Sequence, residues 1–142
     1  MNSRDLVSAL ESLRLPNEAF RHRQHLQATV YYLRTFGFPA AQEHMLRVIN
    51  RYATGLGHQQ KFHVTLTCCW TRLVAAALDA EKSARSFEEF LEYNPDLLDK
   101  KMPLRFYSRD LLFRDDARAR WVEPDLQVLP VCPPHAGVRP WD

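Results

Sequence analysis

Glycine and other turn-forming residues are widely spaced in this sequence, and in the segments between them the apolar residues recur with the period of a helix. Only four of the 142 residues are glycine. Side chains that follow alternating four- and three-residue steps share one face of a helix. One such set is Glu18, His22, His25, Thr29, Tyr32 and Phe36, and a second is His63, Thr67, Trp70, Val74 and Ala77. The pattern predicts an all-α protein that folds as a compact helical bundle.

Turn-forming and helix-capping residues indicate where the expected helices begin and end. Longer helices are expected over about 18–36, 39–54 and 60–80, and short ones over about 3–13, 87–93, 94–98 and 111–113. The helix over 18–36 should stop at Gly37, and Ser86 with Glu89 forms a capping-box pattern. A strand is a rival over 63–67, because this stretch alternates and is rich in β-branched residues. A helix is favoured there because no breaker separates the stretch from residues 72–80.

The sequence predicts one helical domain over residues 1–130, followed by an extended proline-rich tail over 131–142. Five prolines occur in the 21 residues from Val122 onward. Proline lacks the backbone N–H that helices and central strands require, so this part is expected to be extended.

Composition narrows the classes of protein to consider. The formal net charge is only +2, and the basic residues are scattered among acidic ones without forming a basic stripe, so no nucleic-acid partner is expected. No apolar run approaches the roughly 20 residues needed to cross a bilayer, so no membrane partner is expected either. The three cysteines form no Cys-x-x-Cys pair, which argues against a structural zinc finger. A cytoplasmic location is expected, and the oligomeric state is left open.

Three histidines on the two apolar stripes form a candidate metal site. On one helix His22 and His25 are neighbours, and His63 would face them from a second helix. Glu18 lies one turn before His22 and would supply an oxygen ligand or orient an imidazole. Three neutral imidazoles suit a divalent metal such as zinc, copper or iron(II). The competing interpretation is that each histidine is a hydrogen-bonded core residue.

Other side chains near these histidines are candidates for substrate contact or proton transfer. The Tyr32 hydroxyl would contact substrate or a proton, and His58 would act as a mobile acid or base from a glycine-rich loop. Thr29, Thr67 and Trp70 would line a pocket for a small organic molecule.

Two motifs resemble those of a family of small, all-helical, largely uncharacterised bacterial proteins. The motifs are Phe20-Arg21-His22-Arg23-Gln24-His25-Leu26 and Phe62-His63-Val64-Thr65-Leu66-Thr67-Cys68-Cys69-Trp70. Asn94-Pro95, Tyr107-Ser108 and Val122-Glu123-Pro124-Asp125 are similar too, and the resemblance covers about residues 18–130. It implies a helical fold and a shared polar site, without an established reaction. Many members carry glutamate where this chain has Val64, so any role for that carboxylate is absent or filled otherwise.

Three functions are compatible with these observations. The first is a small metal-dependent enzyme that acts on an organic metabolite. The second is a metal-free enzyme, an isomerase, lyase or cyclase, in which histidine is the acid or base. The third is a binding module without catalysis, whose polar cluster fixes the register of the helices.

Overall fold

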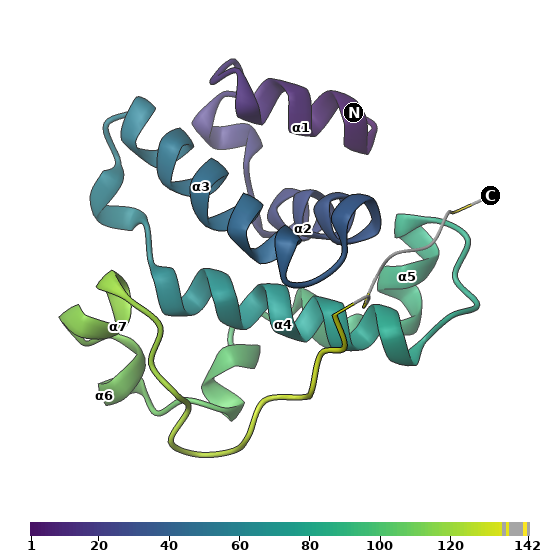
Figure 1. Cartoon of the computed structure of the whole chain (residues 1–142). Helices are drawn as coiled ribbons and strands as arrows, with labels where there is room; N and C mark the ends of the chain where they lie inside the picture. Colours follow the sequence, from purple (N-terminus) through teal and green to yellow (C-terminus); the bar gives the residue numbers. More distant parts are fainter. Residues whose placement is uncertain (135, 137–140, 142) are drawn as a thin grey trace.

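The computed structural model describes residues 1–134, 136 and 141. Within these residues the regular secondary structure is entirely helical, which confirms the predicted all-α class (Figure 1). Half of the expected tail over 131–142 falls on residues 135, 137–140 and 142, which lie outside the described residues. The tail therefore stays a prediction.

Three helices form the N-terminal half, and their ends follow local sequence signals. They are α1 (Ser3–Glu11), α2 (His22–Phe36) and α3 (Ala40–Gly55). The Asn2 side chain caps α1 by accepting a hydrogen bond from the amide of Asp5 at 2.8 Å. Gly37 ends α2 with a φ of 75°, a conformation that side chains with a Cβ rarely adopt. Helix α1 packs across α2 and α3, and these two pack on each other (Figure 1).

Helix α4 (Val64–Ala80) is the centre of the fold. It packs against α2 and α3 on one side and α7 on the other (Figure 1). A helix enclosed on several sides is apolar over most of its circumference. The buried residues of α4 are Thr65, Thr67, Cys68, Cys69, Trp70, Thr71, Leu73, Val74, Ala75 and Leu78.

Short helices complete the C-terminal half. They are α5 (Phe87–Tyr93), η3 (Pro95–Leu98), η4 (Met102–Arg105), α6 (Arg109–Leu112) and α7 (Asp115–Ala119). Ser86 caps α5 by accepting a hydrogen bond from the amide of Glu89 at 3.1 Å, as the capping-box pattern predicted. From Arg120 to Pro134 the chain has neither helix nor strand. Tyr107 holds this segment by donating its hydroxyl to the carbonyl of Val122 at 2.6 Å.

Two helices start later than the sequence predicted, and both differences bear on the site. A 3-10 turn, η1 (Asn17–Ala19), precedes α2, and Phe20 and Arg21 are non-helical, so α2 begins at His22 and not near Glu18. A second turn, η2 (Gln59–Lys61), precedes α4, and His63 is extended with φ −140° and ψ 110°. The rival strand over 63–67 does not form, because the chain is helical from Val64.

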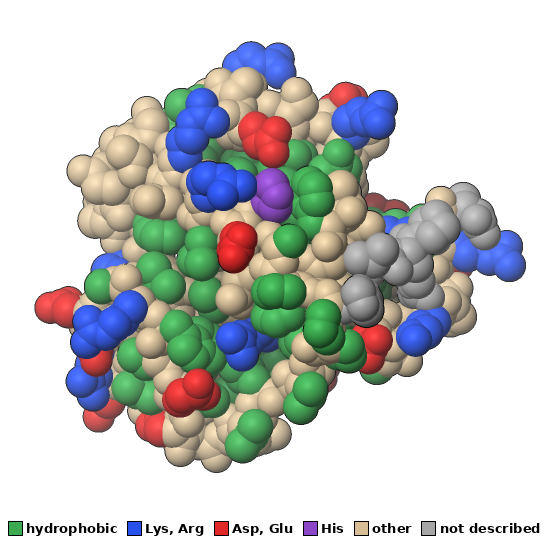
Figure 2. Space-filling view, viewed as in Figure 1, with side chains coloured by type: hydrophobic (Ala, Val, Ile, Leu, Met, Phe, Trp, Pro, Cys, Tyr) green, Lys and Arg blue, Asp and Glu red, His purple; other side chains and the backbone are tan. Residues whose placement is uncertain are grey.

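Figure 2 shows one face of the molecule, on which basic and acidic side chains are interspersed. Hydrophobic side chains gather on the lower part of the same face. Among the residues that the structure describes, no helix has both the length and the apolar character that crossing a bilayer requires.

Candidate functional site

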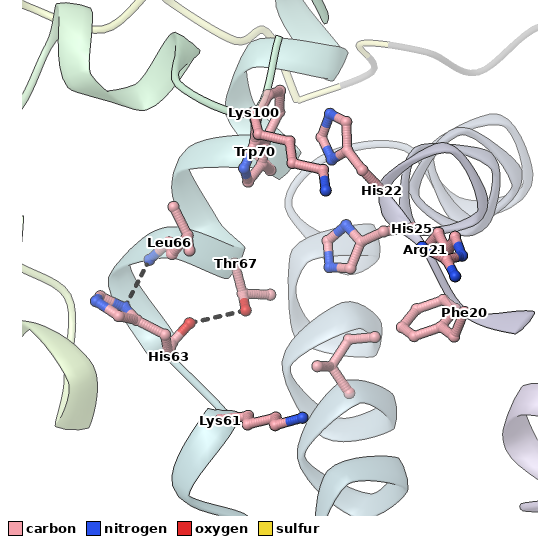
Figure 3. Close-up of a pocket in the computed structure, with 11 residues that line it drawn as sticks. Phe20, Arg21, His22, His25, Lys61, His63, Leu66, Thr67, Trp70 and Lys100 are labelled. Atoms are coloured by element: carbon pink, nitrogen blue, oxygen red, sulfur yellow. Dashed lines mark hydrogen bonds between the residues drawn. The ribbon is translucent and has the colours of Figure 1, made fainter. Parts of the chain in front are cut away.

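A pocket of about 330 Å³ lies where the first turn of α2 meets α3 and the start of α4 (Figure 3). We refer to it as the first pocket. Its described lining residues are Phe20, Arg21, His22, His25, Ile49, Lys61, His63, Leu66, Thr67, Trp70 and Lys100. Aromatic and aliphatic side chains form much of the wall, and nitrogen-bearing side chains supply the polar groups. This combination is typical of a site for a small organic ligand.

His22 is the first residue of α2 and is fixed from two sides. Its Nε2 atom lies 2.8 Å from the carbonyl oxygen of Leu97. A carbonyl only accepts, so Nε2 carries the proton and the neutral ring keeps a lone pair on Nδ1. The ring also packs on Trp70, with centroids 4.6 Å apart. Burial lowers the pKa of His22, and the positive charge of Lys100 adds to this effect.

His25 has no comparable anchor. Its ring lies 5.7 Å from that of Phe20, and within the described part of the chain neither ring nitrogen forms a hydrogen bond with protein. Burial lowers the pKa of His25 to about 4, with a further contribution from His22. At neutral pH this imidazole is therefore uncharged, and it faces the first pocket with a lone pair to which no described residue donates a hydrogen bond.

His63 has a different role from the one its spacing predicted. Its Nδ1 atom accepts a hydrogen bond from the amide of Leu66 at 3.0 Å and so caps α4. Its Nε2 atom lies 2.7 Å from the carbonyl oxygen of Leu112. Both ring nitrogens are thus in use, and Figure 3 shows the ring pointing away from His25. Burial also lowers the pKa of His63, which keeps the ring neutral.

The structure does not bring the four predicted metal ligands together. His22, His25 and His63 all line the first pocket, but the His63 ring points away from His25 and bonds to Leu112, and Glu18 does not line this pocket. In the described ranges, no three side chains of His, Cys, Asp or Glu lie close enough to share one ion. The divalent-metal site stays a prediction that this arrangement does not favour.

Three cationic side chains stand at the rim of the first pocket. They are Arg21, Lys61 and Lys100, all exposed, and no Asp or Glu is among the described lining residues. None of the three forms an ion pair with another described residue. Helices α2 and α4 both begin at this pocket without an acidic residue in the first turn, so their positive dipole ends are not compensated there. The electrostatic field favours an anion.

A second pocket of about 520 Å³ adjoins the first. The two share the lining residues Phe20, Arg21, Ile49 and Lys61. Glu18 and His58, predicted as a metal ligand and a mobile acid or base, both line this second pocket. The structure therefore places these two residues near the histidine pair but in a separate part of the cleft.

The other predicted site residues divide between core and pocket. Thr67 and Trp70 line the first pocket as expected. Thr29 is fully buried and donates its hydroxyl to the carbonyl of His25 at 2.8 Å. Tyr32 is 1% exposed, lies outside both pockets and donates its hydroxyl to Glu11 Oε2 at 2.5 Å. Burial and this bond raise the pKa of Tyr32 strongly.

Sequence reasoning missed the cationic rim and part of the wall. Phe20 and Arg21 belong to the motif that contains His22, and Lys61 precedes Phe62 and His63, so proximity in sequence was a usable signal. Lys100 is different, because it reaches the pocket from a loop far along the chain. Only the packing of η3 against the start of α2, with Leu97 bonded to His22, brings it there.

Comparison of this chain with protein-family models, with curated proteins and with solved structures finds no match, and the resemblance to a bacterial helical family stays a prediction.

Proposed function

We propose that this protein binds a small organic anion in the first pocket and that His25 exchanges a proton with it. The reaction class that fits is metal-free acid–base chemistry, such as isomerisation, elimination or cyclisation. The observation that carries the proposal is the neutral imidazole of His25, which has no hydrogen-bond partner among the described residues, beside three cations that form no ion pair with them.

Each part of the lining has a task in this proposal. Arg21, Lys61 and Lys100 attract and hold the acidic group, as basic side chains do for carboxylates and phosphates. Phe20 and Trp70 bury the apolar or aromatic part of the molecule. His22, fixed by Leu97 and Trp70, presents its Nδ1 atom as a hydrogen-bond acceptor.

The pKa of His25 fits the role of a base that binding adjusts. A general base works best when its pKa lies near the working pH, and a pKa of about 4 is low for that purpose. A bound anion next to the imidazole favours the protonated form and raises the pKa, by roughly one unit or more for a charge within about 4–6 Å. Ligand binding would therefore bring His25 closer to the range in which it accepts and returns a proton.

The test is a binding comparison among ligands of the same size and different charge. Benzoate and phenyl phosphate should bind in calorimetric titrations at low salt, whereas benzamide and benzylammonium should bind at least tenfold more weakly. Lys100→Gln should weaken benzoate binding several-fold. Lys101→Gln is the matched control, because Lys101 is an exposed neighbour outside the pocket.

A second measurement tests the proton transfer. An NMR titration of the His25 ring should give a higher pKa with benzoate bound than without it. Equal binding of benzoate and benzamide, or a His25 pKa that benzoate leaves unchanged, would refute the proposal. Tight zinc binding that depends on His22 and His25 would instead favour the metal-dependent alternative.

A further inference from the structure

The wall that joins the two pockets is a continuous apolar strip on α3. Ile49 and Ala53 are one turn apart on one face of α3, and Leu56, the C-cap residue, follows three positions later. All three are half-buried. Ile49 lines both pockets, and Ala53 and Leu56 line the second. The helix rises about 6 Å from Ile49 to Ala53, and Leu56 extends the strip beyond the end of α3 in the second pocket.

The two pockets differ in the charged groups that line them. The end at Lys100 is cationic and has no described carboxylate in its lining. The second pocket contains Glu18, an exposed carboxylate that forms no ion pair with any described residue. Arg21 and Lys61 line both pockets, so the carboxylate of Glu18 distinguishes the second pocket from the first. A ligand that follows the strip is thus oriented, with its negative group at the histidine pair.

We infer that the two pockets form one bipartite site for an elongated amphipathic organic anion. Its acidic group lies in the first pocket, its apolar body crosses Phe20 and follows the α3 strip, and its far end donates a hydrogen bond to Glu18 from an ammonium or hydroxyl group. This inference rests on the proposed function for the position of the acidic group. It adds the length of the ligand and the chemistry of its other end.

The inference predicts the order in which simple alkanoate probes bind. Octanoate should bind at least fivefold more tightly than butanoate, because its longer chain buries more apolar surface on the strip. Both ω-aminooctanoate and ω-hydroxyoctanoate are compared with octanoate to identify the donor at the far end. At least one of the two should bind severalfold more tightly than octanoate.

Two variants change residues that line the second pocket but not the first. Ala53→Phe fills the second pocket and should weaken octanoate at least fivefold while leaving butanoate within twofold. Thr54→Phe is its control, since Thr54 is the exposed neighbour on the same helix and lines neither pocket. Glu18→Gln is an exposed change that should remove the preference for the ω-amino or ω-hydroxy chain. Glu43→Gln, an exposed change on α3 away from both pockets, should not.

The outcomes distinguish this inference from the function on which it rests. If benzoate binding depends on Lys100 but chain length, Ala53→Phe and Glu18→Gln have no effect, the bipartite site is refuted and the anion pocket stands. If octanoate binds more tightly than butanoate but neither ω-substituted chain exceeds octanoate, Glu18 is not the far-end partner and the inference fails as stated. If neither benzoate nor any alkanoate binds, both proposals are refuted.

Discussion

The Nε2 atom of His63 lies 2.7 Å from the carbonyl oxygen of Leu112, so one imidazole ties the start of α4 to the end of α6. The same ring caps α4 through its Nδ1 atom. A residue whose spacing predicted a metal ligand thus has a structural position, and both of its nitrogens stabilise the fold.

We expect His63→Ala to destabilise the protein by about 2–4 kcal/mol. The change removes the cap of α4 and leaves the buried Leu112 carbonyl without its donor. His63→Asn should recover about 1 kcal/mol of this loss, because asparagine caps helices but is too short to replace the second bond. Urea unfolding at pH 7.5 measures both values. A loss below about 0.5 kcal/mol for His63→Ala would show that the ring does not join the two helices.

A second prediction concerns pH. His25 has a pKa of about 4 in the folded protein and an ordinary value of 6.5 when unfolded. Between these two values the unfolded chain binds a proton at His25 that the folded protein does not bind. The contribution of His25 to the free energy of unfolding is therefore fully present above pH 6.5 and is lost as the pH falls towards 4. The full loss from His25 is up to about 3 kcal/mol. The lowered pKa values of His22 and His63 act in the same direction.

The variant His25→Gln isolates this effect from the titration of carboxylates. Unfolding free energies of wild type and variant are compared at pH 7.5 and 4.5. The wild type should lose more stability than the variant over this interval. Parallel losses would mean that His25 is not buried as a neutral ring.

A third prediction concerns Tyr32, which the sequence placed in the catalytic group. Its hydroxyl donates to Glu11 on α1, and its ring stacks on His44 with centroids 5.3 Å apart. Tyr32→Phe should therefore cost about 1 kcal/mol of stability through the lost hydrogen bond. Benzoate affinity should stay within twofold of wild type, because Tyr32 lines neither pocket. A large loss of benzoate affinity without a change in melting temperature would show that Tyr32 contributes to the binding site.

The fourth prediction addresses the docking of the extended segment after α7. Thr65 is fully buried and donates its hydroxyl to the carbonyl of Arg120 at 2.7 Å, while the same oxygen accepts from the amide of Val122 at 3.1 Å. Thr65→Val keeps the shape but removes both bonds, so a loss of about 2–3 kcal/mol is expected. Hydrogen exchange at Val122 should accelerate. Unchanged exchange there would show that other contacts hold the segment.

The fifth prediction tests the metal hypothesis directly. The three-histidine site requires His63 to give up two hydrogen bonds, and the structure offers no replacement for them among the described residues. A chelator should therefore leave the melting temperature of the purified protein unchanged at pH 7.5. A fall of several degrees that His22→Ala abolishes would instead show a bound ion that stabilises the folded state.

Much of the helical fold was determined by the sequence itself. Gly37 ends α2 because its backbone adopts a positive φ, and Ser86 starts α5 because its hydroxyl replaces a missing backbone partner. These signals act within one turn of the chain, so the residues alone specify them. The apolar stripe of α4 was readable for the same reason, since periodicity depends only on helical geometry.

Tertiary structure decided the site. Helical spacing predicted that Glu18 and His63 would share faces with His22 and Thr67, but Phe20 and Arg21 are not helical and His63 is a cap. The His63 ring can cap α4 through Nδ1 because its Nε2 atom bonds to the carbonyl oxygen of Leu112, which lies far along the chain. Lys100 joins the pocket in the same way, through the contact of Leu97 with His22. Such contacts form only when distant segments pack, so periodicity and motif spacing carry no information about them.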